Sequence, residues 1–180
     1  MENEVAAMVL MRSALAGFGA RVIVPDVYDW QGAFSDQQGY IVEQFMEGHQ
    51  FCDDFGRMKR DDQKRLLDQI ADIFKAIQTF PLPDSLHGYG GLGFDEAGRV
   101  ITGPTAIPCG GPFTSVADMY SQFMRLQIDM SEKSSLLDGW KGNDIREKLE
   151  QFHAKGLPAL IEKLTDQRPT LIHGDFGNYV

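Results

Sequence analysis

Apolar residues recur at helical spacing in two long stretches of the chain. One stripe consists of Val5, Met8, Val9, Met11 and Leu15. It predicts a helix over residues 4–16, with Asn3 as its N-cap and Gly17 just beyond its end. A second stripe consists of Leu66, Leu67, Ile70, Ile73, Phe74 and Ile77. It predicts a helix over residues 61–79, with charged residues on the opposite side.

Between these helices the pattern changes to that of strands. Two runs rich in β-forming residues, 21–30 and 40–46, flank a polar stretch that contains Gly, Asp and Gln. This arrangement predicts an antiparallel hairpin. Pro25 requires the first strand to begin after it or to lie at a sheet edge, because proline cannot donate a hydrogen bond to a neighbouring strand.

The second half of the chain is mostly helical in pattern. Its predicted elements are a small hairpin turning at Asp95–Gly98, a helix capped by Thr114 or Ser115, a helix from Asn143 to about Lys155, a helical continuation over 157–164 and a short strand over 170–172. Helices and antiparallel strands that follow one another in this order predict an α+β fold.

Composition is that of an ordinary globular protein. The chain has 180 residues, 43% of them apolar and 24% charged, which suits one domain or slightly more. No apolar run approaches the length of about 20 residues that a membrane helix needs. The acidic start lacks the features of a signal or transit peptide. A cytoplasmic protein without a membrane contact is therefore expected.

The formal net charge of −9 argues against nucleic acid as a partner, because such binding requires a basic surface. The charge is compatible with a cationic small-molecule substrate. A simpler interpretation, which stays open, is that the acidic side chains only keep the protein soluble.

No metal site is expected from the histidines and cysteines. His49, His87, His153 and His173 show no metal-binding spacing, and Cys52 and Cys109 lie far apart. Residues 88–93 fit the spacing GxGxxG, but they lead into a predicted hairpin. A nucleotide fingerprint follows a strand and opens a helix, so we do not expect a phosphate-binding loop there.

The strongest chemical signal is His173-Gly174-Asp175, which follows a short apolar run. In kinase-type phosphoryl transfer, an aspartate held in such a loop accepts the proton of the substrate hydroxyl. Gly174 lets the backbone turn sharply. Taken alone, however, these three residues more often form a plain surface turn than a catalytic loop.

Five sequence motifs, taken in their order along the chain, support the catalytic interpretation of His173-Gly174-Asp175. In chain order they are Asn3–Met8, Val24–Tyr28, Tyr40–Gly48, Gly111–Phe113 and Thr170–Asp175. In this order the sequence resembles the aminoglycoside phosphotransferase and choline kinase superfamily, and more closely the fungal proteins of the phosphotransferase family. The motifs look like that family's helix C, fourth strand, fifth strand with hinge, a loop before a helix, and the catalytic loop.

The resemblance implies a protein-kinase-like two-lobe fold with an incomplete small lobe and a mostly helical large lobe. Residues 1–47 would form a partial N-terminal lobe of helix C, two strands and the hinge. Residues 48–180 would form a partial C-terminal lobe that ends in the catalytic loop. The small sheet would then expose an unpaired edge.

The resemblance also implies an ATP- and Mg²⁺-dependent kinase that phosphorylates a small-molecule hydroxyl. Asp175 would be the catalytic base, and His173 would brace its loop. The backbone of Gln44, Phe45 and Met46 would bind adenine, and Glu4 would pair with an ATP-binding lysine. Alternatively, Glu4 is only a helix-start carboxylate and residues 42–46 are only an alternating strand.

Several of the family's polar groups have no counterpart in the sequence. No lysine precedes Glu4, and Val180 stands where the family has a metal-binding asparagine. We therefore expect a chain truncated at both ends, with little or no activity of its own, because electrostatic positioning supplies most of the rate. Two rivals remain: a non-catalytic remnant or binding module of this fold, and an unrelated helical binding domain.

Overall fold

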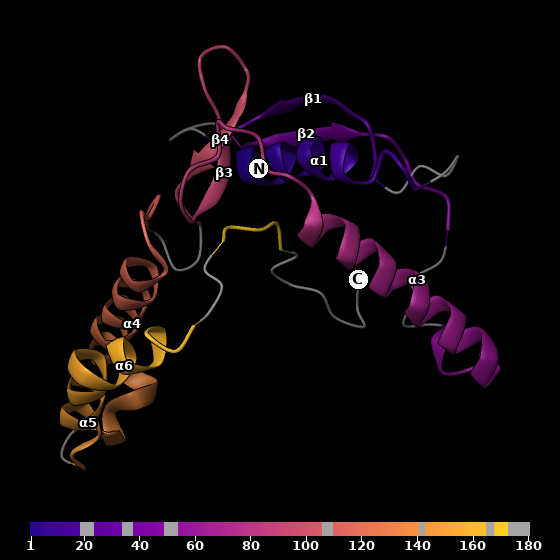
Figure 1. Cartoon of the computed structure of the whole chain (residues 1–180). Helices are drawn as coiled ribbons and strands as arrows, with labels where there is room; N and C mark the ends of the chain where they lie inside the picture. Colours follow the sequence, from indigo (N-terminus) through magenta and orange to yellow (C-terminus); the bar gives the residue numbers. More distant parts are fainter. Residues whose placement is uncertain are drawn as a thin grey trace. The chain divides into compact units, whose positions relative to one another are not determined.

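The computed structural model combines helices with two small antiparallel sheets, so the predicted α+β class is confirmed (Figure 1). The structure describes residues 1–18, 24–33, 38–48, 54–105, 110–140, 143–164 and 168–172. The chain divides into two compact units. The first unit consists of Met1–Pro83 and Thr170–Val180, and the second consists of Asp84–Pro169. The lobes expected at 1–47 and 48–180 stay a prediction.

The first unit is built on α1 (Glu2–Ala14), which contacts the first strand of the hairpin. Its buried side chains are those of Val5, Ala6 and Leu10. The helix begins two residues before its predicted start, because the Val5 N–H bonds to the Met1 carbonyl at 3.0 Å. The prediction of Asn3 as N-cap is therefore wrong, since Asn3 lies within the first turn.

The predicted hairpin is confirmed. Strands β1 (Val27–Gln31) and β2 (Tyr40–Glu43) pair antiparallel, with Trp30 opposite Ile41. The register shifts between Val27 and Asp29. Because β2 ends at Glu43, the predicted strand over residues 40–46 is too long at its C-terminal end.

The predicted helix over 61–79 is also confirmed, as α3 (Arg60–Thr79). Its apolar side is only partly covered: Ile77 is buried, whereas Leu67 is 50% exposed. The helix contacts α1. It ends where Phe80 takes an extended conformation just before Pro81, as expected because proline restricts the residue that precedes it.

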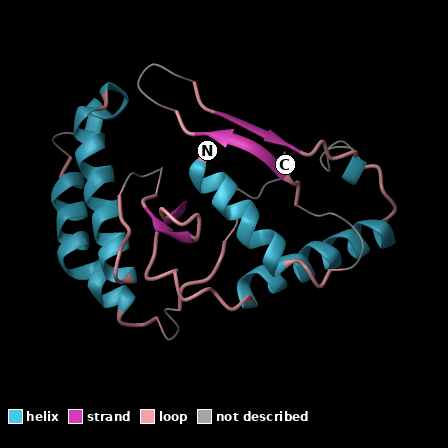
Figure 2. Ribbon diagram, turned by 90° about the horizontal axis from the view of Figure 1, so that it is seen from above, coloured by secondary structure: helices cyan, strands magenta, loops and turns pink. Residues whose placement is uncertain are grey.

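The second unit opens with the predicted small hairpin, formed by β3 (Gly91–Phe94) and β4 (Val100–Gly103) (Figure 2). Residues 88–93 thus lead into a hairpin rather than a helix. Asp95 organises the turn by accepting the N–H groups of Ala97 (3.0 Å) and Arg99 (2.8 Å). Its other carboxylate oxygen accepts the Arg99 Nε–H at 2.8 Å.

We expect Asp95→Asn to destabilise this unit at neutral pH. The backbone N–H of Arg99 is the largest cause that lowers the pKa of Asp95. A carboxyl whose pKa is lower in the folded state stabilises the fold above its unfolded-state pKa. That contribution disappears as the pH falls through the folded-state pKa.

Urea unfolding at pH 7 and pH 3 measures this effect. The stability difference between wild type and Asp95→Asn should shrink at the lower pH. Glu96→Gln is the matched control, because it removes one charge from the same turn. An equal loss for both variants at pH 7 would contradict the role of Asp95.

Helices form the rest of the second unit. They are α4 (Val116–Lys133), the 3₁₀ turn η1 (Ser135–Trp140), α5 (Ile145–Gln151), the π-helical turn η2 (Phe152–Gly156) and α6 (Leu157–Ile161). The cap at Ser115 is confirmed, since its hydroxyl accepts the Asp118 N–H at 3.0 Å. Asn143 accepts the Ile145 N–H at 3.3 Å, although Asp144 occupies the N-cap position.

Phe113 connects the small hairpin to α4. Its backbone forms two hydrogen bonds with Tyr89, of 2.8 and 2.7 Å. Its ring meets Phe123 of α4 edge to face, with centroids 5.4 Å apart. At 3% exposure, Phe113 belongs to the core of this unit.

The predicted strand over residues 170–172 is wrong. These residues have no regular structure, and the Thr170 hydroxyl donates to the Leu171 carbonyl at 3.1 Å. A strand needs a partner strand for its backbone groups, and the described residues provide none here. No helix in the described ranges combines the length and the apolar character needed to cross a membrane.

Candidate functional site

Gln44, Phe45 and Met46 leave the hairpin directly after β2. Gln44 is held in place, because its N–H donates to the Asp26 carbonyl at 2.7 Å and its side-chain Oε1 accepts the Asp26 N–H at 3.3 Å. Phe45 is 85% exposed and Met46 is 40% exposed. The segment is therefore anchored at one end and open along the next two residues.

This geometry limits which backbone groups are open to a ligand. The N–H of Gln44 is already used by Asp26. In the described part of the chain, the N–H groups of Phe45 and Met46 have no hydrogen-bond partner. If this segment binds a planar heterocycle such as adenine, the available groups are these two amides and the backbone carbonyls.

Glu4 lies in the first turn of α1 and is exposed to solvent. None of the described basic side chains forms an ion pair with it. A carboxylate in the first turn of a helix is stabilised by the helix dipole. The structure is thus compatible with the simpler interpretation of Glu4 as a helix-start carboxylate.

The predicted catalytic residues His173 and Asp175 lie outside the described residues. The described chain ends just before them. Leu171 is buried at 7% exposure, whereas Ile172 is 71% exposed. Residues 170–172 are grouped with the unit that holds α1, β1, β2 and residues 44–46.

A second polar cluster, on the helices of the other unit, was not anticipated. Arg125 of α4 donates two hydrogen bonds to the Glu150 carboxylate of α5, each of 2.9 Å. Ser121 Oγ lies 2.9 Å from His153 Nε2, and Arg125 Nη2 lies 3.4 Å from His153 Nδ1. Sequence patterns did not predict these contacts, because Ser121 and His153 are 32 residues apart.

Hydrogen bonding by Arg125 lowers the pKa of Glu150, so this carboxylate is ionised and paired. The arginine also decides the tautomer of His153. Because a guanidinium only donates, Nδ1 accepts and Nε2 carries the proton. Nε2 then donates to the Ser121 carbonyl, 3.1 Å away. With this assignment the cluster links α4 to α5 and η2 through hydrogen bonds.

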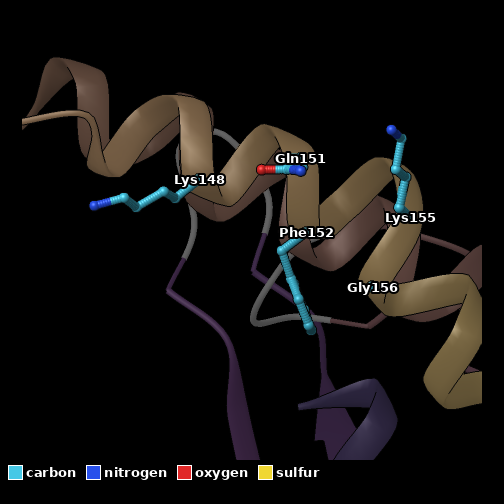
Figure 3. A pocket seen from close by; sticks show the side chains of 5 residues that line it. All are labelled: Lys148, Gln151, Phe152, Lys155 and Gly156. Carbon is cyan, nitrogen blue, oxygen red and sulfur yellow. The ribbon is translucent and has the colours of Figure 1, made fainter.

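A shallow hollow of about 310 Å³ lies on the surface of α5 and η2. Its lining residues are Lys148, Gln151, Phe152, Lys155 and Gly156. Figure 3 shows that the lysine side chains extend in different directions and that Phe152 points away from Lys155. Since a ligand site needs polar groups that converge, this hollow is not a candidate.

The described residues contain no candidate metal site either. Among the residues that the structure describes, no three His, Cys, Asp or Glu side chains gather closely enough to hold an ion. The open segment at residues 44–46 therefore remains the candidate site among the residues that the structure describes.

No family model, curated protein or solved structure matches this chain. The likeness to the phosphotransferase superfamily thus rests on the sequence motifs.

Proposed function

We propose that this chain carries part of an ATP- and Mg²⁺-dependent phosphotransferase that acts on a small-molecule hydroxyl. In this proposal the fold is kinase-like and two-lobed, and residues 44–46 bind adenine. Asp175 accepts the hydroxyl proton, and His173 braces the loop. Glu4, in helix α1, pairs with an ATP-binding lysine.

One observation supports the proposal most directly. Residues 170–172 belong to the same compact unit as residues 44–46, although more than 120 residues separate them in the chain. Leu171 is buried in the structure. A nucleotide site and a catalytic aspartate must lie within one ligand length of each other. This grouping favours such an arrangement over a plain surface turn.

The first test is ATP binding by the full chain, measured by isothermal titration with and without Mg²⁺. We expect Mg²⁺-dependent binding that weakens in Met46→Pro, because proline removes the backbone N–H. Loss of one hydrogen bond predicts a roughly fivefold to tenfold increase in Kd. Glu47→Pro is the matched control, since it leaves the Met46 N–H in place.

Turnover tests the role of Asp175. We expect little or no turnover from this chain in a coupled ATP hydrolysis assay; turnover that Asp175→Asn abolishes would overturn the expectation of inactivity and would support Asp175 as the base, because the amide cannot accept the proton. ATP affinity should stay unchanged, since the aspartate acts on the acceptor. Hydrolysis that is equally fast in this variant would exclude Asp175 as the base.

The alternative function is a non-catalytic binding module of the same fold. It is favoured by the aromatic side chains that the hairpin region presents to solvent, Tyr28 at 67% and Phe45 at 85% exposure. Absence of ATP binding with and without Mg²⁺ would favour this module over the enzyme.

A further inference from the structure

The pairing of Gln44 with Asp26 involves a side chain where an antiparallel ladder normally uses the main chain. Two residues of a hydrogen-bonded antiparallel pair exchange both of their N–H···O bonds. The Gln44 N–H makes the first of these bonds, to the Asp26 carbonyl at 2.7 Å. In the second, the Asp26 N–H donates to Gln44 Oε1 at 3.3 Å, in place of the main-chain carbonyl of Gln44. These two bonds form what we call the Asp26–Gln44 clamp.

A bulge in β1 brings Asp26 opposite Gln44. The register shifts by one residue between Val27 and Asp29, which leaves Tyr28 as the extra residue of β1. Without this extra residue, Val27 would lie opposite Gln44. Bulges bend the strand that carries them and are common beside active sites, where they change the direction of a side chain or end the pairing. The register that allows the clamp is therefore set within the hairpin itself.

Asp26 is also attached to helix α1. Its carboxylate forms an ion pair with Arg12, which lies in the last turn of that helix. A cation at this end of a helix is favoured by the helix dipole. Because both side chains are largely open to solvent, at 40% and 49% exposure, the ion pair itself contributes little stability. The partly buried bond from the Asp26 N–H to Gln44 is therefore the part of this link whose loss should be measurable.

We propose that the side chain of Gln44 is a positioning residue for the nucleotide site at residues 44–46. The inference rests on the proposed function, because Gln44 acts on the ligand through that site. The clamp fixes the direction in which the chain leaves β2. The N–H groups of Phe45 and Met46 follow directly, so their orientation is fixed with it. A ligand that bonds to these amides meets groups that are already ordered, which lowers the entropy cost of binding.

Replacing Gln44 by Met in the full chain tests the clamp without a ligand. Methionine is similar in length, but its thioether is only a weak acceptor. Hydrogen exchange at the Asp26 amide, measured by NMR, should become about twofold to tenfold faster, as expected when one hydrogen bond is lost. The amide resonances of Phe45 and Met46 should also shift. Gln44→Glu should restore both readouts, because a carboxylate oxygen can still accept the Asp26 N–H.

Gln69→Met is the matched control for this replacement. Gln69 is an exposed residue of α3 in the same compact unit, so the variant makes the same chemical change away from the clamp. Its Asp26 exchange rate and its Phe45 and Met46 resonances should remain those of the wild type. A general loss of stability would affect both variants, whereas loss of positioning affects only Gln44→Met and is reversed in Gln44→Glu.

Isothermal titration with ATP and Mg²⁺ distinguishes the positioning role from the proposed function. Gln44→Met should raise Kd by about twofold to tenfold, because the order lost with the clamp must then be supplied on binding. Gln44→Glu should stay within about twofold of the wild type. Wild-type binding with an unchanged Kd and unchanged exchange in Gln44→Met would overturn the positioning role alone. A wild-type chain that does not bind ATP would overturn the proposed function, and the role of Gln44 at a nucleotide site with it.

Discussion

Replacing Phe113 by Ala should lower the free energy of unfolding of the second unit by about 3–5 kcal/mol, the usual cost of removing a buried aromatic ring. Phe113 is 3% exposed and meets Phe123 at an interplanar angle of 88°. The ring is closely surrounded: a Cβ built on Gly111 would lie 2.8 and 2.9 Å from it. Because neighbouring backbone limits relaxation, most of the cavity should remain.

The loss should also detach the small hairpin from α4, since Phe113 bonds to Tyr89 and packs on Phe123. Urea unfolding followed by far-ultraviolet circular dichroism measures the effect. Phe45→Ala is the matched control: the same substitution at 85% exposure should change stability by less than about 0.5 kcal/mol. A loss for Phe113→Ala below about 1 kcal/mol would contradict its role in the core.

Replacing Gly88 by Ala should have the second largest effect. Gly88 has φ +75°, which is unfavourable for residues with a Cβ by about 1–2 kcal/mol. An added Cβ would also collide with the carbonyl oxygen of Phe113. That oxygen accepts the Tyr89 N–H, so it cannot move without breaking the bridge. Overpacking of this kind adds about 1–3 kcal/mol.

Gly98→Ala separates the two contributions. Gly98 has nearly the same φ, +74°, but nothing lies within 4 Å of its added Cβ. We expect its cost to be the conformational part alone, so that Gly88→Ala is worse by about 1–3 kcal/mol. Hydrogen exchange at the Tyr89 amide should increase in Gly88→Ala and stay slow in Gly98→Ala. Equal stability of the two variants would show that the collision is relieved without cost.

The candidate site could be predicted from sequence only in part. The run at residues 40–46 was identified, but the pattern did not show that β2 ends at Glu43 or that the Gln44 amide is taken by Asp26. Apolar alternation extends through Met46, yet regular pairing stops at Glu43 because its partner strand β1 begins at Val27; beyond it, the Asp26 backbone bonds to Gln44. The length of a strand depends on its partner, which lies elsewhere in the chain.

The sequence by itself determined the local elements of this protein. The 3.6-residue stripes located α1 and α3, the turn residues located both hairpins, and the Thr114-Ser115 pair located the start of α4. These features depend on interactions between residues a few positions apart, which a sequence pattern records directly.

Only the tertiary structure decided which distant residues meet. Examples are the Arg125–Glu150 pair, the contact of Ser121 with His153 and the backbone bonds between Tyr89 and Phe113, which all join positions far apart in the chain. Such contacts depend on how whole elements pack, and no short-range periodicity encodes them.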